Sequence, residues 1–573
     1  MKLPSLMTMT TMMMTMALIG LTYANSNQKH FKPPNIVILM ADDMGIDDVS
    51  FHGQKQHITP NIDALAYHGR MLNHLYTPPM CTPSRSALMT GKYPFHTGTQ
   101  HFVIGNEEPW GLPLNFTTIA EVFNEAGYAT NLIGKWHLGF SEKEYLPTYR
   151  GFDSHYGYLG GFIDYYQRMA LMPLPNASIG YDFRRNLDID CDMEGTYMTD
   201  LLTTEAETVI ENHDTETPLF LMVNHLAPHT GNDFEPLQAP ENDIEKFKYI
   251  QDEKRRIYAA MVAKLDESIG NITRALDKKD LLKNTILIFY SDNGAPSIGL
   301  FSNTGSNYPM RGQKNTPWEG GSRVAGAIWS PLLKNRKSVF NQKMSAVDWL
   351  PTLASAADIQ LDPELNVDGL DLWEELSCGI TKPFNRDIIH VLDPISNVVS
   401  IISDGFKYIN GTTINGQFDG VLTTRGEEVD PRDSDYANTV LNSLSSQILA
   451  KYDSVPLTEG AINALRSEGE IKCLNPKEKA SCNPLKEECL FKIDEDPCEE
   501  NNLADDPEFE SILSEIRTTI DIYRLSALKP ANKASLPDGD PSVHDCIWTW
   551  FVESPTTEKN SHCSYQNAPC QRY

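Results

Sequence analysis

The sequence predicts an α/β fold, with a mostly parallel central sheet flanked by helices and a smaller C-terminal domain built on an antiparallel sheet. Apolar runs without alternation, typical of strands covered on both faces, are separated by segments with helical periodicity. Beyond about residue 385, shorter apolar runs are joined by turns. The 573 residues exceed one usual core, so we expect a main domain over residues 31–385 and a C-terminal α+β subdomain with a cysteine-rich tail over residues 386–573.

Four apolar runs predict the strands of the central sheet, at residues 35–40, 129–133, 219–223 and 285–290. Each run ends in polar residues that can do chemistry, namely Asp42 and Asp43, Lys135 and His137, His225 and His229, and Asp292 and Asn293. Ligands of open α/β sheets bind outside the carboxyl ends of the strands. We therefore expect these polar residues to converge at one edge of the sheet.

Helices are predicted between these strands. Thr59 opens one that stops at Gly69, and Thr118 opens another that stops at Gly127. Threonine and glycine are typical of the two ends of a helix. A longer helix is expected over about residues 252–277, where apolar side chains recur in helical register.

The C-terminal part predicts a hairpin and one helix. Residues 388–392, 398–402 and 406–409 are expected to be strands, with a turn at residues 404–405. Residues 508–525 are expected to form a helix that packs on them. The tail after about residue 529 is expected to be ordered mainly by its cysteines.

Residues 81–91 have the pattern of a reactive centre. Cys81 stands just ahead of a predicted helix, with Pro83 at the first helical position and Gly91 at the end. Backbone N–H groups and the positive end of the helix dipole would then face Cys81, and Arg85 adds a cation about one turn further on. The alternative is a buried or disulfide-bonded cysteine.

The number of cysteines bears on whether Cys81 is in a disulfide. The chain has ten cysteines, which fits an oxidising compartment. Setting Cys81 aside leaves an odd number. Either one of the others is free or pairs outside the chain, or Cys81 is itself in a disulfide.

Other features also predict the secretory pathway. Residues 1–24 are expected to be a signal peptide, because Lys2 precedes an apolar run and a small-residue cleavage site; a membrane anchor is the alternative. No second apolar stretch is long enough to cross a bilayer, so stable membrane insertion is not expected. Glycosylation sequons begin at Asn115, Asn176, Asn271 and Asn410.

The charge balance limits the partners. A net charge of −29 argues against nucleic acid and against a broad cationic groove for a long polyanion. A small cationic pocket remains compatible with it. The acidic balance therefore favours a small substrate.

Asp42, Asp43, Asp292 and Asn293 supply oxygen ligands from two strand ends, the donor type that Ca²⁺ and Mg²⁺ prefer. Adjacent carboxylates at Asp42 and Asp43 would repel each other unless a cation or a proton lay between them. The alternative is that both segments form simple polar turns.

Five side chains are candidates for binding an anion or moving a proton. Lys135 and His137 are two residues apart, so in an extended segment they point to the same side. Lys314 lies in a glycine-flanked loop that can approach a ligand closely. His225 and His229 compete for one further acid–base role. The alternatives are solvated surface lysines and structural histidines.

Cys-Thr-Pro-Ser-Arg at residues 81–85 resembles the Cys-x-Pro-Ser-Arg signature of type I sulfatases, and residues 134–139 resemble their second signature. The resemblance extends from about residue 34 to residue 503. Within the family, residues 318–321 and 235–240 are similar to arylsulfatase B, the N-acetylgalactosamine 4-sulfatase. Further family segments follow in the expected order at residues 41–43, 227–229 and 292–294 and at Lys314.

The resemblance implies an alkaline-phosphatase-like sulfatase domain in which Cys81 is oxidised to formylglycine. The formylglycine-generating enzyme would act on the chain in the endoplasmic reticulum. The resemblance also implies one Ca²⁺ ion, with metal ligands Asp42, Asp43, Cys81 (as formylglycine), Asp292 and Asn293.

The resemblance assigns catalytic roles as well. The hydrated aldehyde would attack sulfur while His229 protonates the leaving alcohol. Lys135 and Lys314 would neutralise charge on the sulfuryl oxygens. His137 would take a proton from the remaining hydroxyl so that sulfate is eliminated, and Arg85 would steady the formylglycine.

The expected function is hydrolysis of a sulfate ester by a lysosomal or secreted enzyme. The expected substrate is N-acetylgalactosamine 4-sulfate or another small sulfated glycoside. A glucosinolate sulfatase of a herbivorous insect, a phosphomonoesterase or phosphodiesterase of related fold, and a catalytically dead binding protein are the alternatives. The sequence carries no signal for the oligomeric state.

Overall fold

The computed structural model describes residues 32–172, 177–299, 301–380, 386–474 and 482–552. The expected signal peptide, the Asn176 sequon and two tail cysteines lie outside the described residues. Among the described residues, no helix combines the length and the apolar composition that crossing a bilayer would require.

The main domain is built on one large sheet with the strand order β14-β2-β13-β11-β1-β10-β4-β5-β8-β9. The four predicted strands are its adjacent, mutually parallel centre. Nearly all of their residues are buried, as the unbroken apolar runs predict. The predicted α/β fold is therefore confirmed, with central strands β11 (Thr285–Ser291), β1 (Asn35–Ala41), β10 (Leu219–Asn224) and β4 (Ala129–Lys135).

The register of these strands decides where the polar residues meet. Ala41 pairs with Ser291, Met40 pairs with Asn224, and Asn224 pairs with Gly134. The carboxyl ends of the four strands are therefore level with one another. The residues that follow each strand leave the sheet at the same edge, as the sequence predicts.

The outer strands of the sheet are short and were not predicted. On one side, antiparallel β13 (Gly326–Trp329) continues the sheet to β2 (Arg70–Leu72) and β14 (Ser338–Phe340). On the other side, the sheet ends with β5 (Ser154–Tyr158), β8 (Arg184–Arg185) and β9 (Asp188–Ile189).

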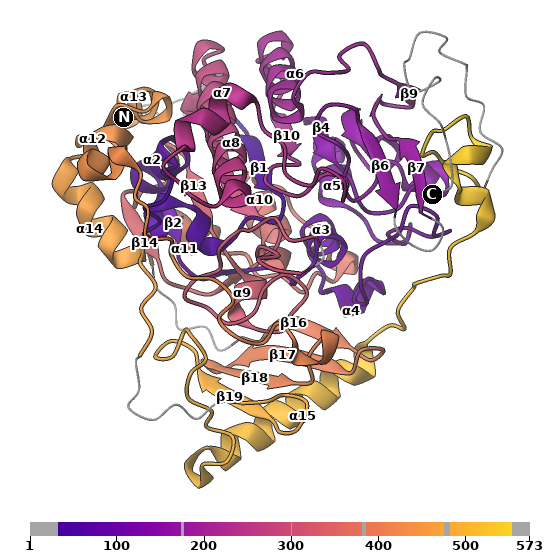
Figure 1. Ribbon diagram of the computed structural model, residues 1–573, viewed down its shortest axis with the longest axis vertical. Coiled ribbons are helices and arrows are strands. Elements are labelled where there is room, and N and C mark those ends of the chain that lie inside the picture. Colours follow the sequence, from indigo (N-terminus) through magenta and orange to yellow (C-terminus); the bar gives the residue numbers. More distant parts are fainter. Residues whose placement is uncertain (1–31, 173–176, 300, 381–385, 475–481, 553–573) are drawn as a thin grey trace, which may run out of the picture.

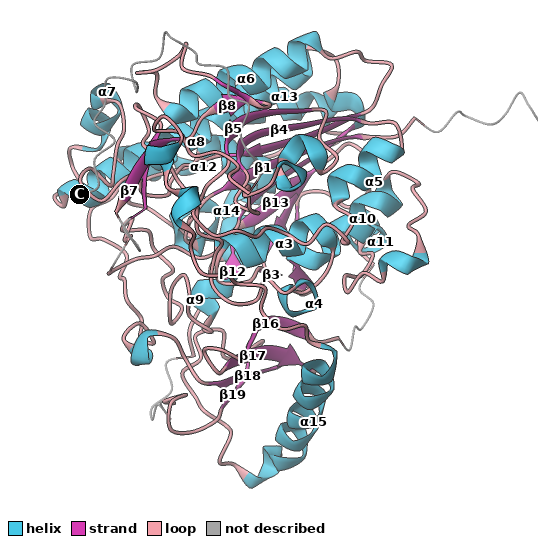
Figure 2. Ribbon diagram, turned by 90° about the vertical axis from the view of Figure 1, so that its right-hand side faces the viewer, coloured by secondary structure: helices cyan, strands magenta, loops and turns pink. Residues whose placement is uncertain are grey.

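The predicted helices are present as α2 (Pro60–His68), α5 (Ile119–Glu125) and α8 (Glu253–Lys278). Thr118 caps α5 by accepting a hydrogen bond from the Glu121 N–H. Two groups of helices lie on opposite sides of the sheet (Figure 2). One group is α2, α8, α6 (Met198–Asn212) and α13 (Leu444–Leu449); the other is α5, α3 (Cys81–Thr90), α10 (Trp349–Ala356) and α11 (Trp373–Cys378).

A second, antiparallel sheet lies below the main domain in Figure 1, with α15 (Glu510–Ser526) along its far side. Leu513, Ile516 and Ile520 of α15 pack on this sheet, as predicted. Its strands are β16 (Ile388–Asp393), β17 (Val398–Ser403), β18 (Phe406–Asn410) and the unpredicted β19 (Cys489–Lys492).

Not all of the chain after residue 385 belongs to that sheet. Helices α13 and α14 (Glu459–Gly469) lie beside the main domain, where α13 packs against α2 and α8. The domain boundary near residue 385 stays a prediction.

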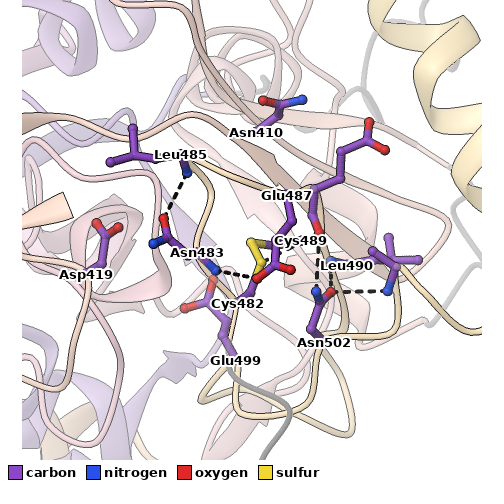
Figure 3. Close-up of a disulfide and its surroundings, with 12 residues drawn as sticks. Asn410, Asp419, Cys482, Asn483, Leu485, Glu487, Cys489, Leu490, Glu499 and Asn502 are labelled. Atoms are coloured by element: carbon purple, nitrogen blue, oxygen red, sulfur yellow. Dashed lines mark hydrogen bonds between the residues drawn. A yellow bond between two sulfur atoms is a disulfide. The ribbon is translucent and has the colours of Figure 1, made fainter. Parts of the chain in front are cut away.

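The disulfides answer the question raised by the cysteine count. Cys473 is bonded to Cys498, and Cys482 is bonded to Cys489 at the start of β19 (Figure 3). Cys191 and Cys546 are also in disulfides. Cys81 and Cys378 are the free cysteines among those described. A disulfide at Cys81 is therefore contradicted, and Cys378 accounts for an unpaired cysteine among the other nine.

Candidate active site

Cys81 is the first residue of α3 and so lies in its first turn. Gly91 ends the helix in the left-handed conformation (φ 63°), as predicted. The predicted start is wrong by two residues, because Pro83 occupies the third helical position. Proline is tolerated there, since the first four N–H groups of a helix have no partner within it.

The predicted acidic residues gather around this cysteine. Cys81 Sγ lies 3.7 Å from Asp42 Oδ1 and 3.9 Å from Asp43 Oδ1. Asp292 completes a buried group in which one potential ligand atom from each residue lies within 4.8 Å of the others. The Asp43 N–H donates to Asp292 Oδ1 across 3.2 Å and joins the two strand ends.

Each of the three carboxylates has a cation of its own. Lys135 Nζ lies 2.7 Å from Asp42 Oδ2, and Lys314 Nζ lies 2.7 Å from Asp43 Oδ2. The third pair is Arg85 Nη2 with Asp292 Oδ2, at 2.8 Å. The side chain of Lys135 is fully buried and that of Lys314 is 15% exposed, so neither is a solvated surface lysine.

These cations keep the aspartates ionised. Burial raises the pKa of Asp42, but Lys135, His229 and Arg85 outweigh it and leave that pKa below its ordinary value. Burial is likewise outweighed at Asp43, chiefly by Lys314. Both side chains are therefore negatively charged at neutral pH.

The pKa of the Cys81 thiol shifts in the opposite direction from those of the aspartates. Burial raises its pKa to about 12, although Lys135 and Lys314 act against this rise. The thiol is thus protonated at neutral pH in its protein surroundings. Because the thiolate is the nucleophilic form of cysteine, the encoded side chain is a poor nucleophile here.

Asn293 supplies an observation that fits a hard cation. Its side-chain nitrogen donates to Asp43 Oδ1 at 2.7 Å and to the Gly294 carbonyl at 2.9 Å. Its Oδ1 atom is buried and finds no hydrogen-bond donor within the described part of the chain. A buried amide oxygen beside three carboxylates is the oxygen donor set that suits Ca²⁺ or Mg²⁺.

Of the two competing histidines, His229 reaches the site. Its Nε2 lies 3.3 Å from Asp43 Oδ2, and its Nδ1 lies 2.7 Å from the Thr230 carbonyl. A carbonyl only accepts hydrogen bonds, so Nδ1 carries a proton and Nε2 is the atom that can gain or lose one. The ring stacks on Phe162 with centroids 5.6 Å apart. Burial lowers the pKa of His229.

His225 points elsewhere, as its structural alternative predicts. Its Nε2 lies 3.1 Å from Ser268 Oγ of α8. Burial lowers its pKa to about 3, so the ring is neutral.

His137 lies in the site for a reason other than the predicted one. Strand β4 ends at Lys135, and His137 has a left-handed backbone (φ 60°), so alternation along an extended segment does not place it. Gly161 leaves room for its ring, since a Cβ at 161 would stand 2.9 Å from His137 Cε1. Burial holds the pKa of His137 well below its ordinary value, and its Nδ1 has no partner among the described residues.

Residues 34–359 match the model of the Sulfatase family. The chain belongs to the sulfatase family. Arylsulfatase J from Mus musculus is 43% identical over 364 residues, which cover 63% of this chain and 58% of that protein. N-acetylgalactosamine-6-sulfatase from Mus musculus is 31% identical over 383 residues, covering 64% and 70%.

A solved structure supports the same family and fold. The crystal structure of Ps i-CgsB in complex with k-i-k-neocarrahexaose superposes with a TM-score of 0.66 at 26% identity, covering 87% of this chain and 94% of that chain. Members of the sulfatase family are sulfuric ester hydrolases. The family is the one that the signatures at residues 81–85 and 134–139 predict.

Two asparagines of this sulfatase site were missing from the predicted set. Asn303 Nδ2 donates to the Asp43 carbonyl at 2.8 Å and to the Pro228 carbonyl at 3.1 Å. Asn224 Nδ2 donates to the Lys135 carbonyl at 3.0 Å. Asn224 ends an apolar run, which could have marked it. Asn303 lies in an irregular loop without a motif.

Proposed function

We propose that this protein hydrolyses a sulfate ester through a formylglycine made from Cys81, with one Ca²⁺ ion in the site. The observation that carries the proposal is the placement of Cys81. It lies in the first turn of α3 with its sulfur 3.7 Å and 3.9 Å from two ionised aspartates. An unmodified thiol with a pKa of about 12 has no evident use at such a position.

The residues fit the ion that the family implies. Asp42, Asp43, Asp292, Asn293 and the modified side chain at position 81 would hold Ca²⁺. When bound, the ion would supply positive charge that polarises the oxygen atoms at position 81 and on the sulfate. The unpartnered oxygen of Asn293 and the preference of Ca²⁺ for carboxylate and amide oxygens support this assignment.

Three cationic side chains are placed to bind the sulfate and to hold the site. Lys135 and Lys314 contact different aspartates next to Cys81, so each can face a sulfuryl oxygen as negative charge develops. Their ion pairs hold them in place before the substrate arrives. Arg85 would keep Asp292 and the residue at position 81 oriented.

Two histidines would move protons. In its protonated form, which the neighbouring Asp43 and Asp42 carboxylates favour, His229 would donate the Nε2 proton to the leaving alcohol, since its Nδ1 is occupied by the Thr230 carbonyl. Burial keeps His137 neutral, which is the form that accepts a proton from position 81. Each histidine would thus serve a different half of the reaction.

The proposed substrate is a small sulfated glycoside, with N-acetylgalactosamine 4-sulfate as the first choice and a glucosinolate as the alternative. The net charge of −29 supports a small substrate over a long polyanion. We further propose secretion or lysosomal delivery after modification by the formylglycine-generating enzyme, which the disulfides support.

Mass spectrometry of the peptide that spans Cys81, together with turnover assays on the same preparation, tests this function. We expect an aldehyde oxygen in place of sulfur, and hydrolysis of a sulfate ester. Cys81→Ala should abolish turnover and keep the fold. Cys81→Ser should also fail, because serine lacks the second hydroxyl needed to eliminate sulfate. An unmodified thiol in a fully active preparation would contradict the proposal.

A further inference from the structure

A cavity of about 350 Å³ lies between the main domain and the C-terminal sheet. Its size falls in the range of ligand sites, roughly 300–1,000 Å³. One side is formed by segments of the main domain on either side of α3, and the other by β16 and residues 412–415. None of the predicted site residues lines it.

The cavity nevertheless shares its wall with the reactive centre. Met80 and Pro83, on either side of Cys81, both line the cavity. Asn315, which follows Lys314, lines it as well, and the Asn315 N–H donates to the Pro79 carbonyl at 2.7 Å. The two segments that carry the proposed nucleophile and a sulfate-binding lysine are therefore also walls of this cavity.

Two strained apolar residues line the cavity from opposite domains. Phe102 is 54% exposed with a φ of 56°, and Ile414 is 49% exposed with a φ of 48°. A left-handed backbone is strained for a bulky or β-branched residue. Both residues thus combine backbone strain with an apolar side chain left in water, a cost that an apolar ligand in the cavity would offset.

Two buried polar atoms in the cavity wall have no hydrogen-bond partner among the described residues. Gln100 donates through Nε2 to the Leu528 carbonyl at 2.7 Å, while its Oε1 has no donor within the described residues. His390 of β16 is buried, and its Nε2 is likewise unpartnered in the described part of the chain. Buried polar atoms are almost always hydrogen-bonded, so both call for a ligand or for water.

The charged residues that line the cavity limit the kind of ligand that it can bind. Its lining includes no lysine or arginine among the described residues. Besides the buried His390, its ionisable residues are His101 and Asp393, whose Nδ1 and Oδ2 atoms lie 2.7 Å apart. An anionic group would meet Asp393 without a free cation to balance it. The remaining walls are largely proline and aliphatic side chains.

We propose that this cavity receives the part of the substrate that lies beyond the sulfated sugar, and that this part is uncharged, partly apolar and carries hydroxyls, as the aglycone of an aryl or alkyl glycoside can be. The inference rests on the proposed function and narrows its substrate class. Phe102 and Ile414 would cover the apolar part, while Gln100 and His390 would bind hydroxyls. An adjoining anionic sugar, as in a sulfated polysaccharide, would be rejected.

The test compares three substrates with the same sulfated sugar: the free sugar, its phenyl glycoside and its 4-carboxyphenyl glycoside. We expect kcat/KM for the phenyl glycoside to exceed that for the carboxyphenyl glycoside by about tenfold or more. Val391→Trp would fill the cavity from β16. It should raise KM for the phenyl glycoside about tenfold and leave hydrolysis of the free sugar unchanged.

Two further variants keep the test decisive. Ile395→Trp adds the same side chain on the same hairpin at an exposed position outside the cavity, and should change nothing. Ile414→Gly removes an apolar lining residue at a backbone angle that glycine tolerates, so it should fold and still raise KM for the phenyl glycoside.

The outcomes separate this inference from the proposed function. If the free sugar is hydrolysed but Val391→Trp and Ile414→Gly leave KM for the phenyl glycoside unchanged, the cavity assignment is wrong. Equal kcat/KM values for the phenyl and carboxyphenyl glycosides would also overturn it. If Cys81 is unmodified and no sulfate ester is hydrolysed, the proposed function itself fails.

Discussion

Lys407 Nζ lies 2.9 Å from Glu319 Oε1, and both side chains are fully buried. Glu499 Oε1 lies on the same ammonium at 3.0 Å. Lys407 belongs to β18 of the C-terminal sheet, whereas Glu319 follows Lys314 by five residues in the main domain. The ion pair therefore ties the sheet to the segment that positions a proposed sulfate-binding lysine.

Removing this cation should destabilise the protein strongly. Lys407→Met would leave two buried carboxylates without their ammonium, which costs about 3–5 kcal/mol of unfolding free energy. Urea unfolding measures the loss. Arg517→Met is the matched control, since its pair with Glu488 is partly exposed and contributes about 0–1 kcal/mol. Equal losses of unfolding free energy in the two variants would contradict the view that the buried ion pair contributes more than the exposed one.

Glu499 should make stability depend on pH. Burial raises its pKa from 4.5 to about 7, so the folded chain holds this proton more tightly than the unfolded chain does. Its contribution to stability is complete below about pH 4.5 and is lost as the pH rises through about 7. Glu499→Gln should remove that part of the pH dependence. Unfolding free energies measured between about pH 5 and about pH 8 provide the check, and an unchanged slope would disprove it.

The two histidines on the segment after β10 should differ in activity. His229→Gln should lower kcat for an alkyl sulfate about 10²–10⁴-fold, because the leaving alcohol loses its proton donor. The loss should be smaller with 4-nitrophenyl sulfate, whose leaving group needs little protonation. His225→Gln is the control, because the His225 ring is hydrogen-bonded to Ser268 of α8. Similar kcat losses in both variants would argue against a proton transfer by His229.

Metal affinity should depend on the oxygen of Asn293. Asn293→Ala removes the unpartnered Oδ1 and should weaken Ca²⁺ binding roughly 10–100-fold. Asn293→Asp keeps an oxygen at that position and should bind Ca²⁺ more tightly than the alanine variant. Calorimetric titration of chelator-treated protein gives both affinities. A Ca²⁺ affinity untouched by Asn293→Ala would remove this residue from the ligand set.

The fold was predictable where a strand is buried on both faces, because such a strand is a long apolar run in the sequence. Strands β1, β4, β10 and β11 are covered on both faces, so each is a continuous apolar run. The edge strand β2 has three residues, too few for any periodicity to show. Its place is set by pairing with β13 and β14, which lie far away in the chain.

The sequence predicted which residues form the site, but not which cationic side chain contacts which aspartate. Strand ends and signatures pointed to the aspartates, both lysines and Cys81, but nothing local says that Lys135 faces Asp42 while Lys314 faces Asp43. Asn303 supports Asp43 from a position 260 residues away. Such contacts depend on tertiary packing, which sequence periodicity does not encode.

The burial of Cys81, which is only 1% exposed, limits the time at which it can be converted. A modifying enzyme would have no access to the sulfur once α3 has docked against the aspartates, so the proposed oxidation would have to precede folding. Under the proposed mechanism, each molecule would become active or inert during its synthesis. The specific activity of a homogeneous, well-folded preparation would then report the fraction of chains in which Cys81 was converted, and later treatment of the native protein would not raise it.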